Sequence, residues 1–172
     1  MTLSMKTLSA LGLVGLAVVL GRAQGNVNFS GTWMLDKSQS DVSQLMATSD
    51  APEKIRNASM TMVVEQEGSN LRVTRILKIV AEEKKEIHTY KTDGGETMNT
   101  GFQGEPVVGR AFWEGDKLVI VSTHTRRVLL KDVRIESRGV WSLSPDGKTL
   151  TIAAQINSPR GEQRVRAVFD KS

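Results

Sequence analysis

A short glycine-containing turn recurs three times in this chain and constrains the fold more than any other feature. Segments 68–73, 115–120 and 147–152 all read Gly-x-x-Leu-x-(Val or Ile). Glycine reaches the positive φ that closes a short hairpin, and the residues after it alternate between apolar and polar as a strand does. Two further turn sequences, Thr-Asp-Gly-Gly-Glu at 92–96 and Pro-Arg-Gly at 159–161, separate runs of similar length. The chain therefore predicts an antiparallel meander.

The turns divide the chain after residue 30 into about ten strands. Segment 37–57 is polar and lacks strand alternation, so we expect it to be irregular or to hold short helices opened by Asp41 and Pro52. Val128, Leu129 and Leu130 interrupt the alternation, which indicates a candidate β-bulge. The strands are expected at 31–36, 58–66, 70–80, 84–92, 96–102, 107–113, 117–126, 128–143, 148–157 and 162–170.

A single meander of so many twisted strands tends to close on itself, because closure removes its exposed edges. The expected fold class is therefore all-β. We expect one antiparallel up-and-down β-barrel of about 8–10 strands, with a short helical or irregular segment between the first two strands.

The first 23 residues have the three parts of a secretory signal peptide. Lys6 supplies the positive charge, residues 8–20 form an apolar stretch, and small residues allow cleavage after Ala23 or after Gly25. The stretch is shorter than the roughly 20 residues that span a bilayer, which disfavours the alternative of an uncleaved anchor. We expect a signal peptide at 1–23 and one exported domain at 26–172, periplasmic or extracellular, with no integral membrane segment after processing.

The charge and the absence of cysteine narrow the class of protein further. Without cysteine there is no disulfide and no lipid attachment through a thiol, so the core alone must stabilise the barrel. Loss of Lys6 and Arg22 with the signal peptide leaves 21 basic and 19 acidic residues, which lowers the net charge from +4 to +2. Nothing in this composition indicates a nucleic-acid partner.

Catalytic and metal-binding motifs are nearly absent. The chain has no Gly-x-Ser-x-Gly sequence, no metal-spaced cluster of histidine and cysteine, and no phosphate-binding glycine loop. His88 and His124 are the only histidines, and they fall on different predicted strands. We therefore expect no metal and no cofactor, and favour a binding protein over an enzyme.

The turn motif also fixes which side chains should point inward. If Leu71 and Val73 face the barrel interior, Arg75 does too, unless the alternation slips and leaves it in solvent. The same argument places Ser122 and His124 inward, and puts Tyr90 on one face with His88 and Glu86. A guanidinium in a barrel interior needs a partner, and an anionic head group could supply it. The candidate ligand contacts are Arg75, Tyr90, Ser122, His124, Met60 and Met62.

Residues 28–36, Asn-Phe-Ser-Gly-Thr-Trp-Met-Leu-Asp, resemble the opening strand of the calycin superfamily of lipocalins and fatty-acid-binding proteins. The later layout is similar to small lipocalin-like proteins that bacteria export. The resemblance implies a barrel for small hydrophobic ligands, with Gly31 and Trp33 as fold markers. It further implies that a last-strand arginine, here Arg164 or Arg166, lies against Trp33, although the alternation places both outward. The Arg-x-Tyr pair that holds a carboxylate in fatty-acid-binding proteins has no tyrosine here.

Three functions stay open at this point. The leading hypothesis is an exported lipocalin-like protein that binds a small apolar or amphipathic molecule in the barrel interior. The second is a structural or interaction protein of the cell envelope with a filled barrel. The third is a barrel enzyme of the isomerase or cyclase type, which requires at least two of His88, His124, Tyr90 and a carboxylate to converge within one cavity. The sequence does not specify the oligomeric state.

Overall fold

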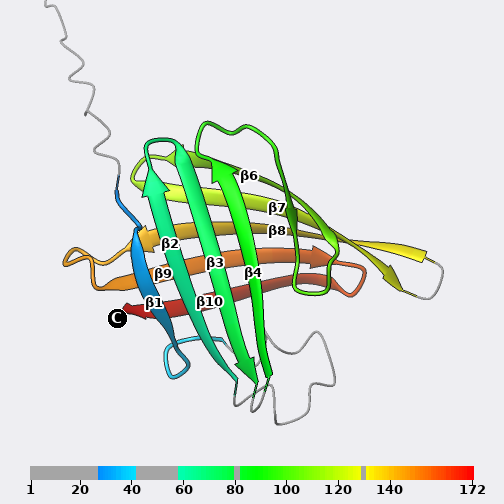
Figure 1. Ribbon diagram of the computed structural model, residues 1–172, viewed down its shortest axis with the longest axis horizontal. Coiled ribbons are helices and arrows are strands. Elements are labelled where there is room, and N and C mark those ends of the chain that lie inside the picture. The colour runs from blue at the N-terminus through cyan, green and yellow to red at the C-terminus, as the bar shows by residue number, and fades with distance from the viewer. Residues whose placement is uncertain (1–26, 42–57, 80–81, 129–130) are drawn as a thin grey trace, which may run out of the picture.

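A computed structural model describes residues 27–41, 58–79, 82–128 and 131–172 (Figure 1). All ten expected strands are present, each within three residues of its predicted bounds. The predicted signal peptide, and the part of the inter-strand segment from 42 to 57, lie outside the described residues. Within them, no helix is long and apolar enough to cross a membrane. The strands are β1 (Gly31–Asp36), β2 (Ser59–Glu67), β3 (Asn70–Ile79), β4 (Glu82–Lys91), β5 (Thr97–Thr100), β6 (Pro106–Glu114), β7 (Lys117–Val128), β8 (Lys131–Leu143), β9 (Thr149–Ser158) and β10 (Gly161–Lys171).

The strands form one antiparallel sheet in the order β4-β3-β2-β1-β10-β9-β8-β7-β6-β5. The first and last strands pair, with Leu35 opposite Phe169, and this pairing rolls the sheet into a nearly closed barrel. Figure 1 shows the consequence: β2, β3 and β4 run across the front of β6 to β9. The all-β up-and-down fold expected from the turns is confirmed.

The recurring turn motif has the backbone that its glycines predicted. Gly68, Gly115 and Gly147 have φ values of 56°, 65° and 68°, in the left-handed region that favours glycine. The leucine three residues after each glycine is buried: Leu71, Leu118 and Leu150 are at most 1% exposed. Each turn therefore also determines which residues of the following strand face the interior.

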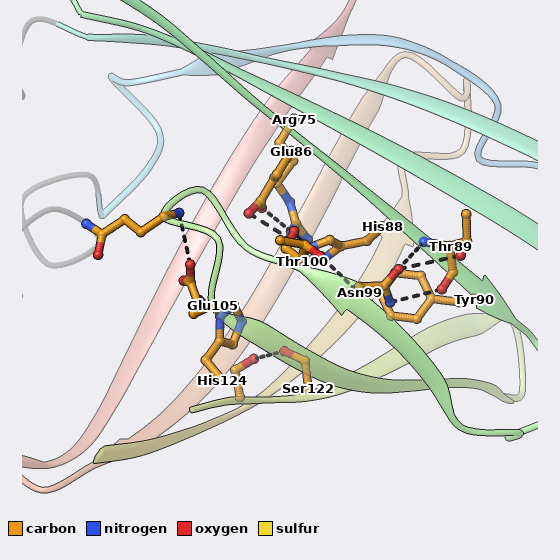
Figure 2. A network of polar contacts seen from close by, with 12 residues as sticks. Arg75, Glu86, His88, Thr89, Tyr90, Asn99, Thr100, Glu105, Ser122 and His124 are labelled. Carbon is orange, nitrogen blue, oxygen red and sulfur yellow. Dashed lines mark hydrogen bonds and ion pairs between the residues drawn. The ribbon is translucent and has the colours of Figure 1, made fainter. Parts of the chain in front are cut away.

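The sheet has a seam between β4 and β5, which are the two edges of the strand order. The side chain of Asn99 on β5 bridges it: its Oδ1 accepts from the Thr89 amide at 2.7 Å, and its Nδ2 donates to the Thr89 carbonyl at 3.1 Å (Figure 2). An asparagine amide has the same donor and acceptor pair as a peptide group, so it substitutes for one rung of the ladder. Side chains hold the barrel together at this line.

Trp33 anchors the apolar end of the barrel. Its ring is fully buried, its Nε1 donates to the Phe29 carbonyl at 2.9 Å, and the Lys171 ammonium lies 5.2 Å from the ring centroid. The prediction that Arg164 or Arg166 lies against the Trp33 ring is wrong. Arg164 pairs with Glu162, and Arg166 donates to the Gln39 carbonyl, both on the outer face where the alternation of β10 directs them.

The prediction of a β-bulge near Val128 is also wrong as far as the described residue pairs of β7 and β8 extend. The β7–β8 register runs without interruption from Leu118 opposite Trp141 to Val128 opposite Lys131. The alternation breaks there because one strand ends and the next begins. Leu129 and Leu130 themselves lie outside the described residues.

Candidate functional site

Four polar side chains meet on the inner face of β3 and β4, and we call Arg75, Glu86, His88 and Tyr90 the inner polar cluster (Figure 2). Glu86, His88 and Tyr90 alternate along β4 and therefore point to one side. Arg75 lies opposite Glu86 on β3 and donates through Nη1 to the Glu86 carboxylate at 2.9 Å. Glu86, His88 and Tyr90 are buried, and the Arg75 side chain is 25% exposed. Of the two alternatives left open for Arg75, an inward position or a position in solvent, the structure shows the inward one.

Hydrogen bonding specifies the protonation of His88. Its Nε2 lies 3.2 Å from the Thr100 carbonyl, and a carbonyl only accepts, so the hydrogen of the neutral ring is on Nε2. Nδ1 then accepts from the Tyr90 hydroxyl at 3.0 Å, with the Arg75 Nη1 at 3.4 Å. The ring is thus fixed between β4 and β5, and the Tyr90 hydroxyl also interacts with the Arg75 guanidinium.

The predicted residues of β7 face the same interior. Ser122 and Ser137 share a hydrogen bond at 2.8 Å, and the rings of His88 and His124 are 6.4 Å apart between centroids. His124 Nδ1 lies 3.7 Å from Glu105 Oε1. His88 and His124 therefore lie near one another and near the Glu86 and Glu105 carboxylates on the inner face, whereas the hypothesis of a barrel enzyme requires such groups to share one cavity.

Met60 and Met62 lie beside the cluster on β2. Met62 is opposite Arg75 in the register and only 1% exposed, so it belongs to the packed core near Trp33. Met60 is opposite Leu77 and half-buried. All six predicted contact residues therefore lie at inward-facing positions, with Met62 inside the core and Met60 partly buried against it.

Sequence reasoning missed Glu105. Its carboxylate is 8% exposed, and Arg126 Nε lies 3.5 Å from it. The segment between β5 and β6 carries it inward: the Gln103 amide donates to Glu105 Oε2 at 2.9 Å. No alternation pattern extends through such a turn, so its direction could not be read from the chain. Among the described residues, no group of three histidine, cysteine or acidic side chains is placed to hold a metal ion.

Burial strongly influences the protonation states of the titratable side chains in the barrel interior. It lowers the pKa of His88 below 6.5, and the Arg75 charge lowers it further. Burial likewise lowers the pKa of His124 and raises that of Tyr90. For Glu105, burial alone would raise the pKa, but backbone hydrogen bonds, Arg126 and His124 outweigh it and lower the pKa. Near neutral pH both histidines are therefore uncharged and Tyr90 is protonated.

Acidification should destabilise the barrel from about pH 6.5 downward. The unfolded histidines titrate near 6.5, whereas both folded rings have a lowered pKa, so the unfolded state binds more protons below that value. Stability is retained above pH 6.5 and falls as the pH drops. Urea unfolding at intervals from pH 8 to pH 5 measures the slope. In the double variant His88→Gln/His124→Gln the slope over this interval should flatten, and an unchanged slope would refute the assignment.

Tyr90 packs directly on the backbone of β6. A Cβ placed on Gly109 would lie 2.5 Å from Tyr90 Cε1, closer than atoms can approach. Gly109→Ala should therefore lower the free energy of unfolding by about 1–3 kcal/mol. Gly139→Ala is the matched control, because its Cβ would meet Ile152 and Trp141 at an ordinary 3.5 Å. Chemical denaturation of both variants tests this, and equal losses would contradict it.

A separate groove of about 670 Å³ lies over the ends of β2, β3 and β4. Of the residues that line it, only Tyr90 belongs to the inner polar cluster. Glu65, Glu67, Arg72 and Lys91, which also line it, are exposed. The groove is therefore lined both by these exposed charged side chains and by the buried Val64, Leu71 and Tyr90.

No protein-family model and no curated protein matches this chain. Solved structures match its fold. Zebrafish ileal bile acid-binding protein, complexed with cholic acid, superposes with a TM-score of 0.61 at 16% identity, over 84% of this chain and 98% of that one. The REP1-NXSQ fatty acid transporter gives 0.60 at 11%, over 83% and 95%. Human cRBP IV gives 0.58 at 15%, over 85% and 99%. At these identities the likeness establishes a calycin-like fold.

Proposed function

We propose that this chain is an exported binding protein that holds a small amphipathic molecule inside its barrel. The observation that carries the proposal is that solvent still reaches polar side chains on the inner face, both in the inner polar cluster and on β7. The side chains of Arg75 and His124 are 25% and 26% exposed although both point inward. A barrel filled by its own side chains would bury them, as it buries Trp33 and Leu118.

The fold neighbours support a hydrophobic ligand. Their names describe a fatty acid transporter and a bile acid-binding protein in complex with cholic acid. Apolar burial would supply most of the affinity, at about 0.8 kcal/mol for each methylene removed from water. The polar side chains of β4 and β7 would orient the head group, which is the division of roles common in small-molecule sites.

Export is part of the proposal and rests on the signal-peptide features of residues 1–23. We expect the protein recovered from the periplasm or the medium to begin at Gln24 or Asn26. N-terminal sequencing of that material measures the cleavage point. A chain that still carries residues 8–20 and sediments with membranes would refute processing and favour an anchor.

Native mass spectrometry of the protein from its own host tests the binding role. We expect one small molecule retained per chain and released when the same sample is denatured. The purified protein should also enhance the fluorescence of Nile red, a neutral apolar dye, with saturation at one site. A chain that carries no molecule and does not bind the dye would instead favour the filled-barrel alternative.

A further inference from the structure

We infer that the interior selects ligands with a neutral hydrogen-bonding head group, such as a hydroxyl or carbonyl, over ligands with a carboxylate. This inference rests on the proposed binding function and adds the chemical class of the ligand. It follows from how the charges of the inner face are already matched to one another.

The guanidinium best placed to receive an anion is occupied. Arg75 donates to Glu86 at 2.9 Å, and the Glu86 side chain is only 5% exposed. A ligand carboxylate at Arg75 would face the fixed negative charge of Glu86, or would displace it and leave that charge buried without its partner. Leaving a buried charge unpaired is strongly unfavourable. The Arg75–Glu86 pair therefore carries no net charge, and Arg75 does not act as a free cation toward a ligand.

The other cations on the inward register, Lys84 near the start of β4 and Lys171 at the end of β10, are exposed. The remaining inner groups near Arg75 are neutral or paired. His88 and His124 are neutral near pH 7 because burial disfavours their charged forms. Arg126 is matched by Glu105 at 3.5 Å. Arg164 and Arg166 of the last strand are exposed on the outer face, while Val165 and Ala167 take the buried positions between and beside them.

The groups that remain to meet a ligand are neutral donors and acceptors. The Tyr90 hydroxyl donates to His88 and is also hydrogen-bonded to Arg75, and the Ser122 and Ser137 hydroxyls form a short pair on the neighbouring wall that keeps one hydrogen to donate. A hydroxyl or carbonyl oxygen can exchange hydrogen bonds with such groups without bringing a charge into the barrel. The cost of burying an uncompensated charge is then avoided.

The test compares two ligands of equal chain length, 1-dodecanol and dodecanoate, by displacement of Nile red at pH 8, where the acid is ionised. We expect the wild-type chain to bind dodecanol at least about tenfold more tightly, equivalent to roughly 1.4 kcal/mol. Equal affinities, or tighter binding of dodecanoate, would overturn the inference while leaving the binding function intact. Failure to bind Nile red and either ligand would refute the binding function itself.

The variant Glu86→Gln sharpens the test. Glutamine keeps an oxygen that accepts from Arg75 but removes the negative charge, so dodecanoate affinity should rise about tenfold and dodecanol affinity should change far less. Glu65→Gln is the matched control, since Glu65 pairs with Arg72 on the exposed surface at 3.4 Å and should alter neither affinity. A Glu86→Gln chain that folds, by circular dichroism, yet keeps the wild-type preference would overturn the role of Glu86. If it does not fold, the wild-type comparison of the two ligands decides alone.

Discussion

Replacing Trp33 with alanine is expected to lower the free energy of unfolding by about 3–5 kcal/mol, the range for a large aromatic side chain removed from a packed core. The ring is 0% exposed and contributes three kinds of interaction. It packs in the core cluster, its Nε1 satisfies the Phe29 carbonyl at 2.9 Å, and it receives the Lys171 ammonium over its face. Urea unfolding followed by far-ultraviolet circular dichroism measures the loss.

Met34→Ala is the matched control for Trp33. Met34 is the next residue on β1, points to the opposite face and is 52% exposed, so its truncation should change stability by less than about 0.5 kcal/mol. Should Trp33→Ala fail to fold, Trp33→Phe retains the ring packing and loses the hydrogen bond, and we expect an intermediate destabilisation. A Trp33 variant no less stable than Met34→Ala would show that Trp33 does not anchor the barrel.

Removal of the Arg75 charge is the second large effect. Arg75→Met should lower the free energy of unfolding by about 3 kcal/mol, because Glu86 is left buried without its counter-charge. The exposed Arg72–Glu65 pair, which joins β3 to β2, provides the comparison: Arg72→Met should lower the free energy of unfolding by about 0–1 kcal/mol. Denaturation of both variants measures the difference between a buried and an exposed ion pair.

A double variant separates two contributions to the loss of stability in Arg75→Met: the missing attraction between Arg75 and Glu86, and the burial of the Glu86 charge without a partner. In Arg75→Met/Glu86→Gln the buried negative charge is gone, so most of the loss of Arg75→Met should be recovered. If the double variant is instead as unstable as the sum of the two single variants, Arg75 and Glu86 are not coupled. That outcome would also remove the basis for the proposed charge selection.

Most of the fold could be predicted because turn chemistry and strand alternation are local. The three Gly-x-x-Leu turns fixed both the strand ends and the inward face of Arg75, Ser122 and His124. What the chain could not specify depended on contacts between distant segments. Lys171, not Arg164 or Arg166, lies over Trp33, since the pairing of β1 with β10 sets which cation reaches the ring. The signal peptide stays a prediction.

The sequence predicted which way the side chains of the candidate site point, but it did not predict the contacts between them. Alternation put Glu86, His88 and Tyr90 on one face, yet the partnership of Arg75 with Glu86 depends on the β3–β4 register, which no residue pattern specified. Glu105 reaches the interior through an irregular turn, where alternation carries no information. The seam bridged by Asn99 is equally a product of how the sheet curls.

The pairing of β1 with β10 has a kinetic consequence. Every other strand pairing joins neighbours in the chain order, whereas Trp33 and Lys171 stand opposite one another across nearly the whole described sequence. Short hairpins form in microseconds, but joining distant segments bears a larger loop-closure entropy and slows folding. Hairpins can therefore form early and independently, whereas the ten-stranded sheet is complete only when β1 pairs with β10. The step that limits the folding rate should be this final encounter, with Trp33 at its centre.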